Sequence, residues 1–276
     1  MTFFPDKIAP GYYKARMLEL YHHSTSVCAA KVRMALDEKD IPWKGHYIDI
    51  LKGDQFTPEF LKLNPKGLVP VLIDDGKVIL ESTVINEYIE DAFPKTPLRP
   101  DSAGDRAQMR FWTKLIDEQL HRACAVITFS VFHRHIILKL SEQELQDYLE
   151  AMPSPELRAK KKGWILQGVD APDAQEAFKA YFKSLNELDQ ALDGNDWSAG
   201  PSFSLADIAW APYVNRMAML GMNGMFTTRV ARWFDRIQAR ESFKPTVLDW
   251  IPADMTADMK SRGQEAWPQV KGILGL

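Results

Sequence analysis

VPVLIDDGKVILESTVINEYIEDAF, residues 69–93, is the stretch of sequence that decides the fold. Residues 69–74 have the short apolar pattern of a strand, and Asp75-Gly76 is a strong signal for a tight hairpin turn. Residues 77–80 supply the partner strand. Apolar side chains then recur with helical spacing over residues 83–93. The stretch therefore predicts a β-hairpin that leads directly into an amphipathic helix.

The residues before this unit add two further strands and two further helices. Residues 17–21 alternate between apolar and polar side chains as in a short strand, and residues 28–39 repeat apolar side chains at helical spacing. A second strand is expected at residues 43–50, and a helix is expected to start near Thr57. The order β-α-β-α-β-β-α predicts a small α/β domain at residues 17–93.

The remainder of the chain has a different character. Residues 94–101 are rich in proline and are expected to form an interdomain linker. Strand signals then disappear, and residues 102–276 are expected to form an all-helical domain. Its long helices are predicted to begin at Ala103, Asp173, Ser204 and Thr228. Ser204 and Asp207 have the spacing of a capping box, in which each side chain bonds the backbone of the other residue.

Three segments lie outside this regular pattern. Residues 1–16 are expected to be an N-terminal extension, and residues 141–170 an irregular insertion between the first two long helices. The basic run at residues 158–162 is interpreted as a solvated helix face, because the chain as a whole is acidic. The tail, residues 245–276, is expected to wrap around the helical domain.

The composition excludes several classes of function. The chain has 276 residues, a mass of 31.5 kDa and 46% hydrophobic residues, enough for two packed domains. Its net charge of −3 argues against a nucleic-acid partner. Cys28 and Cys124 lack C-x-x-C spacing, which excludes a dithiol mechanism and a cysteine zinc site. We expect no metal, no membrane span and no targeting segment, a combination typical of a cytoplasmic protein.

The sequence resembles the cytosolic glutathione transferases. Residues 64–72, NPKGLVPVL, match the family pattern N-P-x-x-x-V-P-x-L, and residues 81–85, ESTVI, match E-S-x-x-I. The capping box at Ser204 also has a counterpart in the family. The resemblance implies an N-terminal thioredoxin-like α/β domain, an all-α C-terminal domain, and glutathione as co-substrate.

The resemblance also implies where glutathione binds. A cis bond at Val69-Pro70 would turn the backbone of Val69 outward, where it could pair with the cysteinyl backbone of the tripeptide. Backbone N–H groups and the hydroxyl of Ser82 suit the γ-glutamyl carboxylate, and Glu81 could receive the γ-glutamyl ammonium. For the glycyl carboxylate, Gln55 and Lys66 are the candidates.

The catalytic residue is expected in the loop at residues 21–28. Residues 34–43 align with the serine-type pattern of the theta and delta classes, which places Ser26 on their catalytic serine. A free thiol has a pKa near 8.5, and lowering it by about two units takes roughly 2.7 kcal/mol of preferential thiolate stabilisation. A hydroxyl hydrogen bond to a charged acceptor supplies about 1.5–3 kcal/mol, and a helix N-terminus adds about 0.3–1 kcal/mol. No general base is then required.

Other residues of this loop stay open as alternatives. A shifted register places Cys28 on the catalytic cysteine of the beta class, and such a cysteine would favour mixed disulfides with glutathione. Ser24 or Thr25 could also meet the sulfur. Because His22 and His23 are adjacent after a strand, their side chains should point to opposite faces and are interpreted as packing or surface residues.

The acceptor pocket of this family lies between the two domains. The candidates for it in the helical domain are Arg110, Lys114, Phe129, His133, Tyr213 and Met217. Residues 81–94, 98–100 and 110–118 look most similar to bacterial transferases that include the glutathione-dependent β-etherases. The resemblance implies a hydrophobic, aromatic electrophile as substrate, with β-aryl ethers as one class. In such an ether the thiolate displaces an aryloxide from the carbon next to a ketone.

Two other functions remain open at this stage. One is a module, or a partner subunit, that binds glutathione or apolar ligands with little turnover. The other is a glutathione-dependent thiol reductase that works through Cys28. The resemblance also implies a dimer, either a homodimer or a heterodimer with a related subunit, formed largely by the first long helix of the helical domain.

Overall fold

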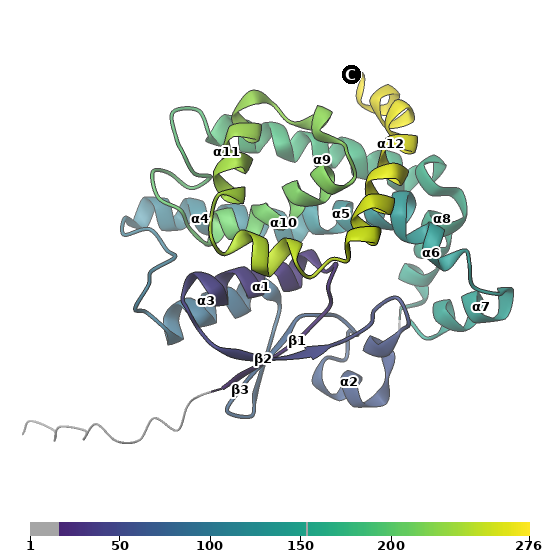
Figure 1. Cartoon of the computed structure of the whole chain (residues 1–276), viewed down its shortest axis with the longest axis horizontal. Coiled ribbons are helices and arrows are strands. Elements are labelled where there is room, and N and C mark those ends of the chain that lie inside the picture. The colour runs from purple at the N-terminus through teal and green to yellow at the C-terminus, as the bar shows by residue number, and fades with distance from the viewer. Residues whose placement is uncertain (1–16, 153) are drawn as a thin grey trace, which may run out of the picture.

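The structure, a computed structural model, describes residues 17–152 and 154–276, so the expected extension at 1–16 lies outside the described residues. Its first part is built on a four-stranded sheet with the order β2-β1-β3-β4 (Figure 1). β1 pairs with β2 in parallel and with β3 antiparallel, and β3 pairs antiparallel with β4. The strands are β1 (Leu18–His22), β2 (Trp43–Tyr47), β3 (Val71–Asp74) and β4 (Lys77–Leu80).

The helices of this part complete the predicted order. They are α1 (Val27–Glu38), the short 3-10 turn η1 (Asp54–Phe56), α2 (Pro58–Leu63) and α3 (Ser82–Ala92). α1 and α3 pack against each other, and apolar side chains of both join those of the strands in one core. The thioredoxin-like α/β domain followed by helices is therefore confirmed as the fold class.

The rest of the chain is helical. A long rod is formed by α4 (Ala103–Leu115), the π-helical turn η2 (Ile116–Leu120), α5 (His121–Thr128), the π-helical turn η3 (Phe129–His133) and α6 (Arg134–Ile137). The later elements are α9 (Pro172–Ala191), α10 (Leu205–Met219), η5 (Asn223–Met225), α11 (Thr228–Gln238), η6 (Lys244–Leu248) and α12 (Ala253–Leu274). Within the described ranges, no helix combines the length and apolar character that crossing a membrane requires.

The capping box predicted at Ser204 is present. The Asp207 carboxylate accepts hydrogen bonds from the backbone N–H of Ser204 at 3.0 Å and from that of Ser198 at 2.8 Å. The indole of Trp233 donates to the same carboxylate at 3.0 Å. Asp207 is fully buried, and desolvation raises its pKa. These donors stabilise the buried group and join α10 to α11 and to the preceding loop.

The expectation of an irregular insertion at residues 141–170 is wrong. This segment folds into α7 (Glu142–Glu150), α8 (Pro155–Gln167) and the turn η4 (Gly168–Asp170). The side chain of Ser141 caps α7, and Glu144 completes a capping box there. Ser154 caps α8 in front of Pro155, which suits the first turn of a helix. Both start signals were present in the sequence.

The tail at residues 245–276 was expected to wrap only the helical domain, but it contacts the sheet domain as well. α12 does pack on α9, but Trp250 lies against the sheet domain. The Trp250 ring meets the ring of His22 at 4.6 Å between centroids, and Arg33 Cζ lies 5.1 Å from the Trp250 ring centroid. The tail therefore joins both parts of the molecule.

The crossing of α12 over the end of α10 allows no side chain at Gly263. A Cβ at this position would lie 1.8 Å from the carbonyl oxygen of Leu220. We predict that Gly263→Ala destabilises the protein by about 3 kcal/mol, because backbone must move to relieve the overlap. The free energy of unfolding measured by urea denaturation would check this.

Gly272 is the matched control in the same helix. Apart from the nearby backbone of α12 and the two neighbouring residues, no heavy atom of the described residues lies within 4 Å of the position that its Cβ would occupy. We expect Gly272→Ala to stabilise the protein by up to about 1 kcal/mol, because alanine restricts the unfolded chain and favours helix. Equal effects of the two substitutions would contradict the steric account.

Candidate active site

Ser26 occupies the N-cap position of α1. Its backbone is extended, and its Oγ accepts a hydrogen bond from the backbone N–H of Ala29 at 3.2 Å. This bond uses a lone pair of the oxygen and leaves the O–H to donate. The side chain is half-buried at the helix N-terminus, where a partial positive charge favours an anion. A thiolate next to Ser26 would accept a hydrogen bond from the hydroxyl. The partial positive charge at the N-terminus of α1 would stabilise it further.

The preceding residues of the loop are held inward. Ser24 and Thr25 are buried, and Ser24 Oγ lies 3.3 Å from the hydroxyl of Tyr47. Arg33 donates to the backbone oxygens of His23 and Ser24, at 3.2 and 3.4 Å. Arg216 of α10 donates to the backbone oxygen of Thr25. The loop is thereby fixed from two domains, and of the three hydroxyls Ser26 is the most accessible.

The expected glutathione cradle lies at the ends of β3 and β4. The Val69-Pro70 bond is cis, as predicted. Glu81 has a φ of 66°, a strained value for a non-glycine residue, at the turn from β4 into α3. Ser82 is the first residue of α3. The first backbone N–H groups of α3 follow this turn and have no acceptor within the helix. Such a helix N-terminus suits a carboxylate.

The two residues expected at the glycyl carboxylate are engaged elsewhere. Lys66 Nζ lies 2.7 Å from Glu81 Oε1, and this hydrogen bond raises the pKa of Lys66. Its ammonium therefore lies beside Glu81, the residue expected at the γ-glutamyl end of the cradle. Gln55 is buried and donates its amide to the backbone oxygen of Ile50 at 3.3 Å.

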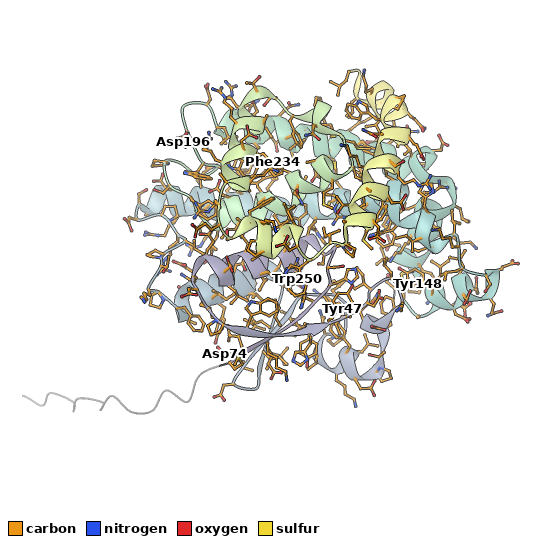
Figure 2. All side chains as sticks on the ribbon, viewed as in Figure 1. Tyr47, Asp74, Tyr148, Asp196, Phe234 and Trp250 are labelled. Carbon is orange, nitrogen blue, oxygen red and sulfur yellow. The ribbon has the colours of Figure 1, made fainter. Side chains whose placement is uncertain are left out.

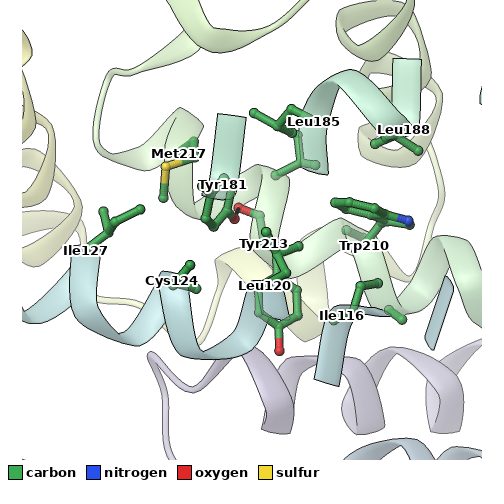
Figure 3. Packing of buried hydrophobic residues seen from close by; sticks show 14 of the residues in the cluster. Ile116, Leu120, Cys124, Ile127, Tyr181, Leu185, Leu188, Trp210, Tyr213 and Met217 are labelled. Atoms are coloured by element: carbon green, nitrogen blue, oxygen red, sulfur yellow. Dashed lines mark hydrogen bonds between the residues drawn. The ribbon is translucent and has the colours of Figure 1, made fainter. Parts of the chain in front are cut away.

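The six acceptor candidates do not form one site. Arg110 pairs with Glu87, and Lys114 pairs with Glu118, both in solvent-exposed ion pairs. Met217 is a fully buried core residue, and Figure 3 shows it beside Ile127 and Tyr181. The remaining three candidates divide between two clusters: Phe129 and His133 meet each other, whereas Tyr213 meets Cys28.

Cys28 belongs to a polar triangle that spans the two domains. Its Sγ lies 3.4 Å from Nδ1 of His121 and 3.6 Å from the hydroxyl of Tyr213, and that hydroxyl lies 3.1 Å from the same Nδ1. Figure 3 shows the Tyr213 ring leaving the core of the helical domain toward α1. His121 was not predicted, because its contact with Cys28 joins residues 93 positions apart in the chain.

The electrostatics of this triangle favour an ion pair. Burial by itself would raise the pKa of the Cys28 thiol, but the charge and hydrogen bond of His121, together with the charge of Lys31, lower it to about 6. The thiolate charge in turn raises the pKa of His121. By contrast, desolvation raises the pKa of the other cysteine, Cys124, to about 11. Cys28 is half-buried and Cys124 is buried.

Metal ligation is the remaining chemistry to consider. Within the part of the chain that the structure describes, no group of three histidine, cysteine, aspartate or glutamate side chains is placed to hold a metal ion.

The fold combines a thioredoxin-like domain, which carries the cis-proline cradle and a serine at the start of its first helix, with an all-helical second domain. This combination is that of a glutathione-dependent transferase. Comparisons with known proteins agree. The model of the glutathione S-transferase N-terminal domain matches residues 25–92, and that of the C-terminal domain matches residues 171–236. The chain belongs to the glutathione S-transferase family.

Two relatives, one of them also available as a solved structure, illustrate the range of this similarity. Protein LigF of a Sphingobium strain is 33% identical over 236 residues, 82% of this chain and 91% of LigF. The crystal structure of the β-etherase LigF superposes with a TM-score of 0.76 at 32% identity, over 83% of this chain and 98% of that one. The tetrachloro-p-hydroquinone reductive dehalogenase of Sphingobium chlorophenolicum is 28% identical over 243 residues, 82% of this chain and 94% of the relative. Glutathione is the co-substrate, and the protein is a glutathione transferase.

The Cys28–His121 pair predicts an unusually reactive thiol. We expect alkylation by iodoacetamide to rise with pH through a midpoint near 6, because the thiolate is the reacting species and its pKa is lowered. His121→Asn should move the midpoint upward by two units or more, since burial then acts without the imidazolium. Mass spectrometry of the labelled peptides would measure both.

Cys124 is the internal control for this measurement. Because it is buried and its pKa is raised, it should remain unlabelled in the folded protein throughout the same pH range. A Cys28 midpoint between 8 and 9, unchanged by His121→Asn, would refute the ion pair.

Proposed function

We propose that the protein joins glutathione to a hydrophobic aromatic electrophile and that Ser26 keeps the attacking sulfur ionised. The observation that carries this proposal is the position of the Ser26 hydroxyl, half-buried at the N-terminus of α1 with its proton available to a ligand. In the proposed complex, the O–H of Ser26 donates to the thiolate, and the N-terminus of α1 adds its field.

The proposed binding mode uses the cradle described above. The backbone of Val69 pairs with the cysteinyl residue of glutathione, and the first turn of α3, with Ser82, holds the γ-glutamyl carboxylate. The Lys66–Glu81 pair lies at the same end, so Glu81 would bind the γ-glutamyl ammonium while Lys66 adds positive charge next to the carboxylate. Gln55 remains the candidate for the glycyl carboxylate, after its amide leaves Ile50.

We further propose β-aryl ethers as substrates. Support comes from the 33% identity to LigF and from the solved LigF structure, which is described as a β-etherase. In this step the glutathione sulfur forms a bond to the carbon next to the ketone, and the bond from that carbon to the aryl oxygen breaks. The electron pair leaves with the oxygen as an aryloxide, so no oxidant or reductant is consumed.

The Cys28–His121–Tyr213 triangle supports a second candidate function, a glutathione-dependent thiol reductase. A thiolate at Cys28 would attack a glutathione mixed disulfide, take over the glutathionyl group and release the substrate thiol. A second glutathione would then attack this intermediate, release Cys28 and leave as glutathione disulfide. The two functions use different residues two positions apart, so they can be separated by substitution.

A set of four single substitutions tests the assignment. We expect Ser26→Ala to lower kcat/KM with a β-aryl ether or with 1-chloro-2,4-dinitrobenzene about 10- to 100-fold, because it removes one charge-assisted hydrogen bond to the thiolate. The pKa of bound glutathione, read from thiolate absorbance, should rise by about one to two units. Cys28→Ser should leave both quantities nearly unchanged.

Ser24→Ala is the matched control, because Ser24 is a buried hydroxyl of the same loop that contacts Tyr47. Ser26→Thr preserves both the hydroxyl and the helix cap and should retain activity. A larger loss with Ser24→Ala than with Ser26→Ala would reject Ser26. Activity toward mixed disulfides that disappears in Cys28→Ser would favour the reductase, and glutathione binding without any turnover would favour a binding module.

We also propose that the protein is a dimer whose interface is formed largely by α4 and α5. Family membership supports this proposal, and the exposed Phe111 on α4 offers an apolar contact. Sedimentation at micromolar concentration should give about twice the chain mass of 31.5 kDa. Phe111→Lys should shift the species toward the monomer, whereas a wild-type monomer at these concentrations would contradict the proposal.

A further inference from the structure

The turn η3 contains a buried histidine whose ring makes no hydrogen bond to the described residues. His133 is only 3% exposed, yet neither Nδ1 nor Nε2 has a partner within the described ranges. Desolvation lowers its pKa well below the usual value, so the ring is neutral and holds one donor and one acceptor. Leaving such atoms unpaired costs about 1–3 kcal/mol each, which calls for an explanation.

The insertion brings two more polar groups of the same kind to this place. Tyr148 of α7 is 7% exposed, and its hydroxyl has no partner among the residues described. Lys161 of α8 places its Nζ 4.0 Å from the ring centroid of Phe129 and 5.1 Å from that of Tyr148. Within the described chain, Lys161 has no carboxylate in ion-pair distance, and desolvation lowers its pKa to about 7.

Lys161 and His133 both lie against the ring of Phe129. Phe129 meets the ring of His133 at 4.8 Å between centroids, on the same side chain that Lys161 covers. The expectation that residues 158–162 form a plain solvated face is therefore wrong for Lys161, which turns inward against aromatic rings. The Lys161 amine, the neutral imidazole of His133 and the side chain of Tyr148 thus lie around Phe129.

The insertion also reaches the glutathione domain. Tyr148, Leu149, Met152 and Ile165 form an apolar cluster with Ile137, and Phe56 of η1 packs against it. Phe56 follows Gln55 directly in the chain. Figure 1 shows α7 on the side of the molecule where α2 lies, and Figure 2 shows Tyr148 on the inward side of α7. The insertion therefore bridges the helical domain and the proposed glutathione cradle.

His133 is also linked electrostatically to the proposed catalytic loop. The charges of Arg216, His23 and Lys161 all act on its ring. Arg216 donates to the backbone oxygen of Thr25, the residue before Ser26. His133 is thus linked through the charge of Arg216 to the loop of Ser26, and through Phe129 to Lys161 of the insertion.

We propose that α7 and α8 complete the acceptor site, and that Lys161, Tyr148 and His133 bind an anionic oxygen on the aromatic electrophile. This inference rests on the proposed transferase function and names its substrate class: aryl compounds that carry a carboxylate or phenolate. The aromatic part would stack on Phe129, in the region now covered by Lys161 and Tyr148. The anionic oxygen would supply the counter-charge that Lys161 lacks and the acceptor that the Tyr148 hydroxyl lacks.

A pair of aryl chlorides that differ in charge tests this site. Glutathione displaces chloride from 4-chloro-3-nitrobenzoate and from 4-chloro-3-nitrobenzamide by the same step, but only the first carries an anion. We expect Lys161→Met to raise the KM for the benzoate about tenfold or more and to change that for the benzamide less than twofold. Tyr148→Phe should raise the KM for the benzoate about three- to tenfold, and Lys161→Arg should restore most of the preference.

Lys160→Met is the matched control, because Lys160 is the neighbouring residue and pairs with exposed Glu156. It should alter neither substrate. An equal effect of Lys161→Met on both substrates, or none on either, would overturn the inference while leaving the transferase function in place.

A binding measurement keeps the inference testable if neither chloride is converted. Calorimetry with the unreactive 3-nitrobenzoate, in the presence of S-methylglutathione, should show about tenfold weaker binding to Lys161→Met than to the wild type. If that loss appears without turnover, the proposed function fails and this site stands. If the wild type does not bind 3-nitrobenzoate, or both proteins bind it equally, the site is refuted.

Discussion

The burial of two cations on α1 is the constraint on which the site depends. Arg33 is fully buried, and desolvation lowers its pKa to about 9. The buried guanidinium is stabilised because three backbone oxygens accept its hydrogen bonds. Two of them belong to His23 and Ser24 in the loop, and the third belongs to Thr246 in the tail, at 2.8 Å. Lys31 reaches Asp117 of the helical domain at 3.1 Å. A charge without such partners would be expensive to bury, so α1 is stable only when both domains and the tail enclose it.

The same arrangement fixes the loop in which we propose that the glutathione sulfur is held. The backbone of residues 23–25 is bound by guanidinium groups from α1 and α10, which leaves the following serine at a fixed place on the helix N-terminus. The same packing brings His121 and Tyr213 to Cys28. The proposed thiolate site at Ser26 and the Cys28 triangle at the domain interface therefore lie within one turn of α1.

Much of the fold could be predicted because its signals are local. The Asp75-Gly76 hairpin, the helix after Glu81 and the capping box at Ser204 each depend on neighbouring residues, and each is present. The insertion at residues 141–170 was predicted, but its two helices were not, although Ser141 and Ser154 are helix start signals.

The candidate site was less predictable, because its contacts join distant parts of the chain. The loop with Ser26 and the cis bond could be inferred from motifs. The positions of His121, Lys161 and Lys66 depend on packing between elements, which no local pattern encodes. Of the residues expected in the acceptor pocket, Arg110 therefore lies on the surface and Met217 in the core.

The contact of Trp250 with His22 and Arg33 has a consequence for cooperativity. The tail and the start of the sheet domain are separated by more than two hundred positions, since Arg33 and Thr246 lie 213 apart, yet they share one buried cation. Opening either segment exposes that cation's partners to water, so the two should open together in a single sub-global fluctuation. The segment at residues 244–250 and the loop at residues 23–25 thus behave as one unit of local stability, and hydrogen exchange in one would follow the other.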